Sequence, residues 1–156
     1  MEIANQYLAG FFDGEGCITF QKFFSKKYQR KYVTAINIEI CQKEPAVLFL
    51  YRNRFGGFIW TRKNRTLSQW QLNGARKIEI FLNAVKPYLI IKRIEAELAL
   101  ELLEKISIPN TNRIKDKSGR IPLTMRSITS EELDRRENLL KRFEADRANP
   151  KHSPIT

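Results

Sequence analysis

The residues best suited to chemistry lie in the segment YLAGFFDGEG, residues 7–16. Apolar residues recur there at helical spacing, and Gly10 and Gly14 leave a smooth stripe on which a second helix can lie. Glu15 falls at the helix end, where the helix dipole disfavours a carboxylate. A divalent cation reverses that penalty, and two such helices packed together would bring two Glu15 carboxylates to shared metal ions. The alternative is an exposed glutamate in a glycine-rich turn.

Other catalytic chemistries find little support in the sequence. The one histidine, His152, stands in a polar, proline-containing tail, which disfavours histidine-based catalysis and zinc binding. Cys17 and Cys41 lack the spacing of a zinc site and are too few for a disulfide scaffold, so we expect both to be reduced. Chemistry should therefore rest on carboxylates, lysines and metal ions, without an organic cofactor.

The charge balance indicates a polyanionic partner. The 156 residues contain 28 Lys and Arg against 17 Asp and Glu, a net charge of +11. A merely soluble basic protein would have the same composition, so the distribution of the charges must decide. No apolar run is long enough to cross a bilayer, and no secretory signal is recognisable. We expect an intracellular protein without a membrane partner.

Hydrophobic periodicity predicts an alternation of helices and hairpins. Residues 3–13 have helical spacing and are followed by glycines that should stop the helix. The spacing then changes to two, with Ile36, Ile38 and Ile40 on one face. The remaining elements follow in this order: strands 17–24 and 31–41, a helix from Pro45 to Gly56-Gly57, strands 58–62 and 67–73, a helix over 75–85, and, after Pro87, a helix over about 92–106 with Ile94, Leu98 and Leu102 as its apolar repeat.

This order implies an α+β fold, with a four-stranded, mostly antiparallel sheet covered by helices on one face. We expect a single domain over residues 1–148, divided into a core, 1–106, and a basic loop with a C-terminal helix, 107–148. Thr129 and Glu132 form a capping box for that last helix. Its buried stripe should contain Leu133, Leu140 and Phe143, and residues 149–156 should form a disordered tail.

The open face of the sheet is the candidate DNA-binding surface. Amide, carboxylate and apolar side chains can read base edges in the major groove, although an ordinary solvated face has the same composition. The basic hairpin loops favour DNA binding over an ordinary solvated face. Like charges clustered in a loop repel one another and are stabilised when they contact phosphates. The candidate face residues are Thr19, Gln21, Phe23, Val33, Ala35, Asn37, Glu39, Trp60, Arg62, Gln69 and Gln71, and the loop residues are Lys26, Lys27, Arg30, Lys31, Lys63, Arg65, Lys115 and Lys117.

Residues 8–16, LAGFFDGEG, resemble the signature of the LAGLIDADG homing endonucleases, and the resemblance covers about the first 106 residues. It implies an αββαββα fold with a saddle-like sheet. It also implies that Glu15, where aspartate is commoner, binds the catalytic metals. Asp13 matches an acidic position that mainly supports the helix end and lies near the metal site, which makes it a further catalytic candidate after Glu15; it would also lie with Gly10 and Gly14 at a dimer interface.

The resemblance implies three further active-site groups. Gln42 occupies the place of an amide that organises solvent, and Lys92 that of a lysine facing the scissile phosphate. One position departs from the family pattern, because Ala46 stands where an arginine is common, and Lys43 is the candidate substitute. The alternatives are a plain strand-to-helix junction for Gln42 and a solvated helix-end lysine for Lys92.

The function implied is that of a site-specific homing endonuclease encoded by an intron or intein. It would hydrolyse both strands of double-stranded DNA with Mg²⁺, which Mn²⁺ or Ca²⁺ could replace for binding. One motif copy implies a homodimer and a long, near-palindromic target, cut to leave 3′ overhangs. We expect the protein wherever that DNA resides, in an organelle (chloroplast or mitochondrion) or the prokaryotic cytoplasm. Alternatives are an RNA-binding splicing maturase, a non-cutting DNA-binding protein on the same fold, and a basic ribonucleoprotein component.

Overall fold

The computed structural model describes residues 4–23, 33–61, 66–104 and 130–148. Their elements follow in the order α1 (Asn5–Glu15), β1 (Gly16–Phe23), β2 (Val33–Gln42), α2 (Ala46–Phe55), β3 (Phe58–Thr61), β4 (Ser68–Leu72), α3 (Ala75–Val85), the 3-10 helix η1 (Lys86–Tyr88), α4 (Arg93–Glu104) and α5 (Ser130–Ala148). The predicted element order is confirmed. The predicted basic loop, tail and hairpin tips lie outside the described residues.

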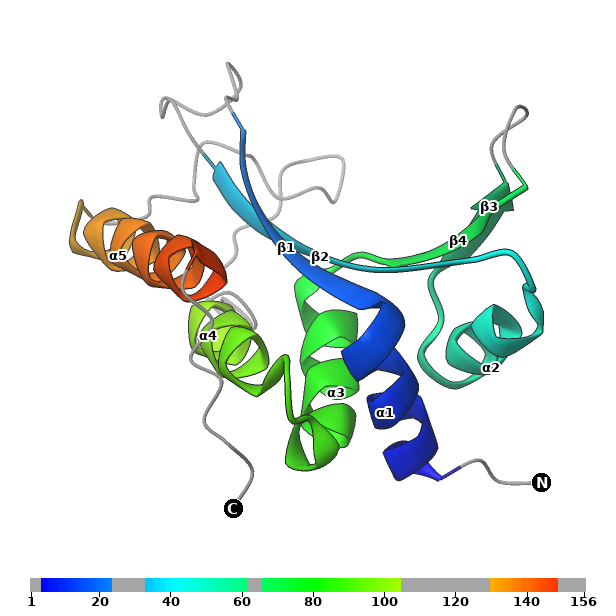
Figure 1. Ribbon diagram of the computed structural model, residues 1–156. Coiled ribbons are helices and arrows are strands. Elements are labelled where there is room, and N and C mark those ends of the chain that lie inside the picture. Colours follow the sequence, from blue (N-terminus) through cyan, green and yellow to red (C-terminus); the bar gives the residue numbers. More distant parts are fainter. Residues whose placement is uncertain (1–3, 24–32, 62–65, 105–129, 149–156) are drawn as a thin grey trace, which may run out of the picture.

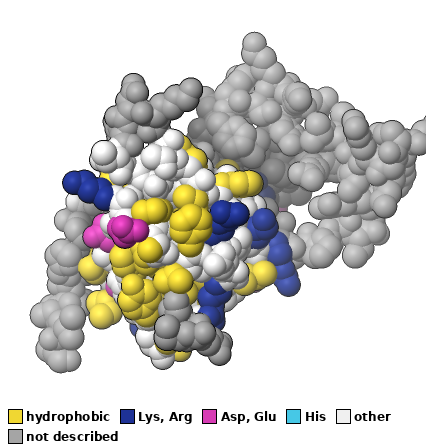
Figure 2. Space-filling model, turned by 90° about the vertical axis from the view of Figure 1, so that its right-hand side faces the viewer, with side chains coloured by type: hydrophobic (Ala, Val, Ile, Leu, Met, Phe, Trp, Pro, Cys, Tyr) yellow, Lys and Arg dark blue, Asp and Glu magenta, His cyan; other side chains and the backbone are white. Residues whose placement is uncertain are grey.

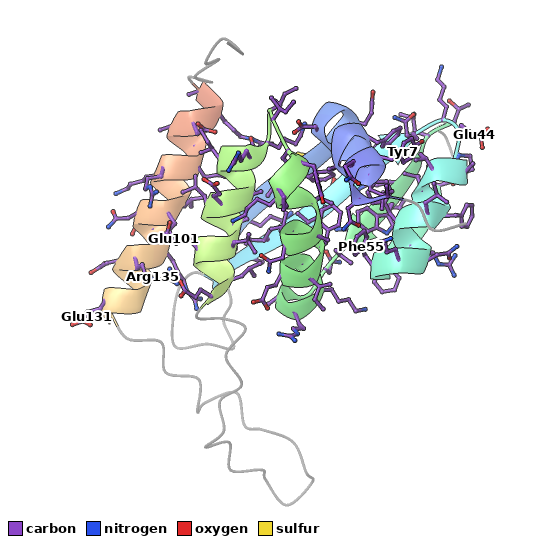
Figure 3. All side chains as sticks on the ribbon, turned by 90° about the horizontal axis from the view of Figure 1, so that it is seen from below. Tyr7, Glu44, Phe55, Glu101, Glu131 and Arg135 are labelled. Atoms are coloured by element: carbon purple, nitrogen blue, oxygen red, sulfur yellow. The ribbon has the colours of Figure 1, made fainter. Side chains whose placement is uncertain are left out.

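The four strands form one antiparallel sheet in the order β1-β2-β4-β3. All five α-helices lie on one side of it, and the sheet curves so that both of its ends rise away from them (Figure 1). Seen from below, the helices lie side by side in the order α5, α4, α3, α1, α2 (Figure 3). The expected α+β architecture, with helices on one face, is therefore confirmed. No described helix is long and apolar enough to span a bilayer.

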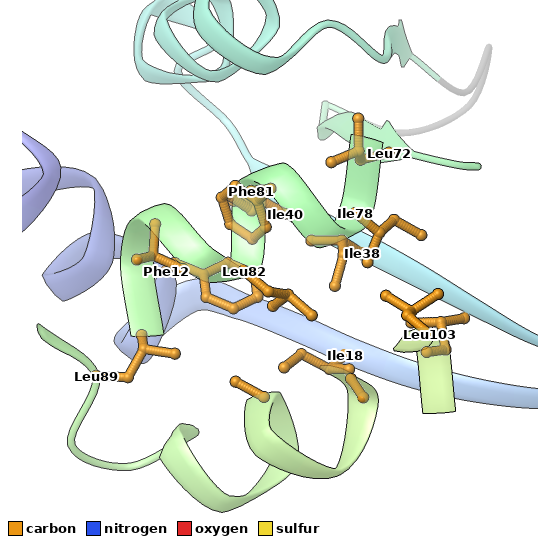
Figure 4. Packing of buried hydrophobic residues seen from close by; sticks show 14 of the residues in the cluster. Phe12, Ile18, Ile38, Ile40, Leu72, Ile78, Phe81, Leu82, Leu89 and Leu103 are labelled. Atoms are coloured by element: carbon orange, nitrogen blue, oxygen red, sulfur yellow. The ribbon is translucent and has the colours of Figure 1, made fainter. Parts of the chain in front are cut away.

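Strand β2 shows how the alternating pattern produces this layering. Ile36, Ile38 and Ile40 are buried against the helices, while the residues between them are partly exposed on the other face. Figure 4 shows Ile38 and Ile40 in the core with Phe12 of α1 and Phe81 of α3. The rings of Phe12 and Phe81 pack edge to face, with their centroids 5.0 Å apart. The sheet and the helix layer thus share one core.

Two buried polar groups attach α2 and the loop after it to their neighbours. The Tyr51 hydroxyl donates a hydrogen bond of 2.5 Å to the carbonyl oxygen of Leu8 in α1. Burial raises the pKa of Tyr51, so this donor stays protonated. The Trp70 indole N–H donates to the Gly56 carbonyl oxygen over 2.8 Å. These bonds fix α1 and the turn at Gly56 while keeping the buried polar atoms satisfied.

Two details of the sequence interpretation are wrong for α1 and α4. Helix α1 does not stop at Gly14 but runs through it, so that Glu15 forms its last residue. Ile94 is 44% exposed, whereas Leu98 and Leu102 are buried. The buried face of α4 is completed by Ala96, Ala99 and Leu103, which places Ile94 on the other side of the first turn.

Helix α5 packs against α4 through a stripe that differs by one residue from the prediction. Leu139 and Phe143 are buried, and Leu140 is only partly buried. The Phe143 ring lies 4.0 Å from that of Phe20 between centroids, which rotates the residues at positions 139 and 143 toward the core. Thr129 and the side chain of Leu133 lie outside the described part of the chain.

Polar contacts hold both ends of α5 to α4. The Arg135 guanidinium donates to the Glu101 carbonyl oxygen over 2.9 Å, and Arg142 pairs with the Glu101 carboxylate at 3.2 Å. Near the other end, Arg147 pairs with Glu95 at 3.2 Å. The Arg142–Glu101 pair is exposed, and the Arg147 side chain is 43% exposed although its partner Glu95 is mostly buried. The buried aromatic contact of Phe143 should therefore contribute more to docking than these pairs do.

We predict that Gly16→Ala lowers the free energy of unfolding by about 1–3 kcal/mol, measured by urea denaturation. A Cβ at Gly16 would overlap the buried Phe12 ring and stand 2.7 Å from the Phe12 carbonyl oxygen. Phe12→Leu should relieve part of this overlap, so the double variant should be more stable than the sum of the two single effects predicts. Additive effects would show that the ring does not impose the requirement for glycine.

Candidate active site

The predicted metal ligand, Glu15, stands at the last position of α1 and is exposed. The chain enters β1 at the next residue, Gly16, whose close approach to Phe12 leaves no room for a side chain. Among the described residues, none forms a hydrogen bond or ion pair with the Glu15 carboxylate. The carboxylate is thus held at a fixed turn with its oxygens open to a ligand.

Asp13 holds the segment that leads into α4. Its side chain is buried, at 7% exposure, and its carboxylate accepts three backbone N–H bonds. One oxygen accepts from Ile90 and Ile91 over 2.7 and 2.9 Å, and the other accepts from Lys92 over 2.9 Å. The Lys92 carbonyl in turn accepts the first helical bond of α4, from Ala96 over 2.9 Å. The carboxylate therefore holds the segment that leads into α4, up to Lys92, the residue just before the helix.

Lys92 approaches the same end of α1 with its side chain. Its Nζ donates a hydrogen bond to the backbone carbonyl oxygen of Asp13. Carbonyl groups in the last turn of a helix carry its partial negative charge, so an ammonium group is favoured there. The contact places the Lys92 charge at the C-terminal end of α1. Glu15 lies at the same end, two residues after Asp13.

Gln42 reaches this region through the register of the sheet. Gly16, the residue after Glu15, pairs with Ile40, which places Gln42 just beyond the start of β1. Gln42 also continues the series of Ile38 and Ile40, so its side chain lies on the helix side of the sheet. The structure thus places Asp13, Glu15 and Lys92 at the C-terminal end of α1, and Gln42 at the end of β2 that pairs with the start of β1.

The sequence departs from the family pattern at the junction after Gln42. Lys43 and Glu44 are exposed, and a Glu44 carboxylate oxygen accepts from the Ala46 N–H over 3.2 Å. Pro45 occupies the N-cap of α2. Residues 44–46 therefore begin a helix and present no cation of their own, which leaves Lys43 as the nearest basic side chain in the sequence.

The open face of the sheet carries eight of the eleven predicted face residues in its described part. The ladder places side by side Thr19 with Asn37, Gln21 with Ala35, Glu39 with Gln71, and Trp60 with Gln69. The same alternation also places Cys17, Cys41 and Phe58 on this face. These three were not among the predicted face residues, although the period of two gives their positions. The face is continuous across all four strands.

The remaining predicted DNA-binding groups cannot be located. Arg62 and the loop cations lie outside the described residues, as do the side chains of Phe23 and Val33. The loop cations concerned are Lys26, Lys27, Arg30, Lys31, Lys63, Arg65, Lys115 and Lys117.

Exposed apolar side chains accompany the glycine stripe of α1. Gly10 and Gly14 are exposed, and a Cβ built on either would meet nothing within 4 Å. Large apolar side chains are exposed on the same helix and on the elements that pack beside it, namely Tyr7 (54%), Phe49 of α2 (43%), and Ile90 and Ile91 before α4 (68% each). Figure 2, which views the molecule from the side of α2, shows hydrophobic side chains gathered into a patch. Such a patch is typical of an interaction surface.

We predict that Asp13→Asn lowers the free energy of unfolding by about 1.5–3 kcal/mol. The asparagine amide would point an N–H group at a backbone N–H from which the carboxylate now accepts a hydrogen bond. Urea denaturation at fixed protein concentration measures the change. Glu44→Gln is the control, since Glu44 makes a single exposed bond of the same kind and should change stability by less than about 0.5 kcal/mol. Equal stability of both variants would contradict the role of Asp13 in holding the segment before α4.

Comparison with known proteins places this geometry in a family. The model of the LAGLIDADG endonuclease family matches residues 8–97. The DNA endonuclease I-CvuI of Chlorella vulgaris is 29% identical over 107 residues, which are 67% of this chain and 65% of that protein. The DNA endonuclease I-CreI of Chlamydomonas reinhardtii is 29% identical over 114 residues, 71% of this chain and 68% of that protein.

The solved structures agree with the sequence relatives. The structure of I-CvuI in complex with the I-CreI target, in the presence of Mg, superimposes with a TM-score of 0.62 at 25% identity and covers 90% of this chain and 94% of that one. The family match spans α1 with its glycine stripe, the whole described sheet and the beginning of α4 that Asp13 holds. The chain belongs to the LAGLIDADG endonuclease family.

Proposed function

We propose that this protein is a site-specific endonuclease that cuts both strands of double-stranded DNA. The observation that carries the proposal is the contact of the Lys92 ammonium with the Asp13 carbonyl oxygen in the last turn of α1, the helix that ends at the exposed Glu15. A protein that only bound nucleic acid would need neither group at that point. Both relatives named above are DNA endonucleases, which supports the same activity.

Glu15 is the residue that would hold a divalent cation, with Mg²⁺ as the expected ion. A carboxylate suits a hard cation, and the helix end supplies negative potential beside it. Within the described part of this one chain, no three His, Cys, Asp or Glu side chains group together, so further ligands would come from phosphate oxygens, water or a second copy. When bound, the ion would lower the pKa of a coordinated water and stabilise charge on phosphate oxygens.

The surrounding side chains prepare the phosphate for hydrolysis. Lys92 brings a positive charge that counters the charge developing on the phosphate, and Asp13 holds the backbone from which Lys92 projects. The Gln42 amide can both donate and accept, which suits it to orient solvent at the site. Lys43 is the candidate for the cation that Ala46 does not provide.

The active unit should be a homodimer, with α1 of each copy at the two-fold axis. The open glycine stripe permits close approach of two helices, and the exposed residues around it supply apolar area. This packing would bring two Glu15 carboxylates together, one for each strand to be cut. A symmetric dimer with two open sheet faces fits a long, near-palindromic target.

We predict that Glu15→Gln lowers the rate of double-strand cutting at least about a hundredfold, because a lost metal contact costs several kcal/mol in the transition state. Binding to the same DNA should persist, since the change removes one negative charge and keeps the side-chain length. Gel analysis of target DNA with Mg²⁺ measures cutting, and Glu44→Gln serves as the matched control. Undiminished cutting by Glu15→Gln would remove this residue from the metal site.

We also predict that Gly10→Ala has opposite effects on the helix and on the dimer. Alanine favours the helix by about 1 kcal/mol and meets no atom of its own chain. It should nevertheless weaken the dimer about tenfold or more, measured by analytical ultracentrifugation, because two α1 backbones could no longer approach as closely. Glu144→Ala on α5, which α4 and α3 separate from α1, should leave the dimer unchanged (Figure 3). A dimer constant unaffected by Gly10→Ala would place the interface elsewhere.

A further inference from the structure

A hydrogen-bonded pair stands near the middle of the open face. The Gln69 Nε2 donates to a Glu39 carboxylate oxygen over 3.0 Å. Glu39 lies on β2 and Gln69 on the adjacent β4, and both side chains are partly exposed. The direct ladder partner of Glu39 is Gln71, so the bond is diagonal and selects one of two neighbouring amides.

The charge of this pair is unexpected for a surface that meets DNA. Among the described side chains that the strands place on the open face, Glu39 alone carries a formal charge, and that charge is negative. The chain as a whole has a net charge of +11. A carboxylate set against a polyanion is repelled unless it accepts a hydrogen bond there.

Gln69 fixes the direction in which that hydrogen bond can form. One carboxylate oxygen of Glu39 is engaged by Gln69, and the other keeps its capacity to accept. Because Gln69 uses one amide N–H for Glu39, it retains one N–H and its carbonyl oxygen. The pair therefore presents an acceptor beside a donor, in a fixed order along the face.

Only two base edges in the major groove donate to such a carboxylate, the amino groups of cytosine and adenine. The adenine amino group lies beside the N7 acceptor, which would face the same carboxylate and repel it. Cytosine presents its amino group without that neighbour, and the guanine paired with it offers the acceptors O6 and N7 to the remaining Gln69 N–H. A C·G pair is thus complementary to Glu39 and Gln69 together.

We propose that Glu39 and Gln69 act as one unit that specifies a cytosine at one position of each half-site. Glu39 accepts from the cytosine amino group, and Gln69 holds the carboxylate and contacts the partner guanine. This inference rests on the proposed function, because it takes the open face to lie in the major groove of the DNA that the protein cuts.

The test is selection of bound duplexes from a randomised double-stranded DNA library, with Ca²⁺ to support binding, by the full chain and three variants. The wild type should enrich cytosine at one position of each half-site. Glu39→Gln should lower the preference for cytosine at that position about ten- to a hundredfold and shift it toward adenine, the base that an amide binds best. Gln69→Met, which keeps the side-chain length, should relax the same position.

Gln71→Met is the matched control, since Gln71 neighbours Glu39 on the same strand as Gln69 but is not its hydrogen-bond partner. It should leave the preference for cytosine at that position unchanged, while it can alter the preference at the base pair that Gln71 itself faces. Selection profiles identical for the wild type and Glu39→Gln, or an A·T pair in place of a C·G pair at the affected position in the wild-type profile, would overturn the inference while leaving the endonuclease intact. If the wild type enriched no duplex at all, the proposed function itself would fail and the inference with it.

Discussion

The site depends on one interaction, the grip of the Asp13 carboxylate on three successive backbone N–H groups. They are the N–H groups of Ile90, Ile91 and Lys92, which follow Asp13 by 77, 78 and 79 positions and lie just before α4. Because the carboxylate is buried and accepts all three bonds, α1 and α4 cannot shift independently without leaving a buried charge unsatisfied. Asp13 therefore fixes the backbones of Glu15 and Lys92 relative to each other, and its own carboxylate oxygens are occupied by backbone N–H groups.

The sequence specified most of the fold wherever a local pattern reports one-sided burial. The alternation at Ile36, Ile38 and Ile40 required a sheet with one covered face, and the structure has it. The strand order could not be predicted, because the pairing of β2 with β4 is set by packing between distant segments and leaves no periodic trace. Ile94 was placed in the core for a related reason: spacing alone does not show which side of the first helical turn faces a neighbour.

The sequence predicts the site only where the interactions are made by side chains, because contacts to backbone groups leave no mark on residue identity. The resemblance placed Glu15 and Lys92 in one active site, but the hydrogen bonds to Asp13 that join the two segments could not be predicted, since a carboxylate bonding backbone N–H groups selects no residue type at 90 and 91. The hydrogen bond from Arg147 of α5 to Cys17 had no signal either, because it joins segments 130 positions apart.

Attraction to DNA and recognition of its sequence are carried by different parts of this chain. The described open face consists of uncharged side chains apart from Glu39, so it contributes little to long-range attraction. The 28 Lys and Arg residues must supply that attraction, and salt screens it. Added salt should then weaken binding to all duplexes alike, whereas the hydrogen-bonding order on the sheet face, which counterions do not alter, continues to discriminate among them. A carboxylate such as Glu39 is tolerable on that face because cations elsewhere bring the DNA to it.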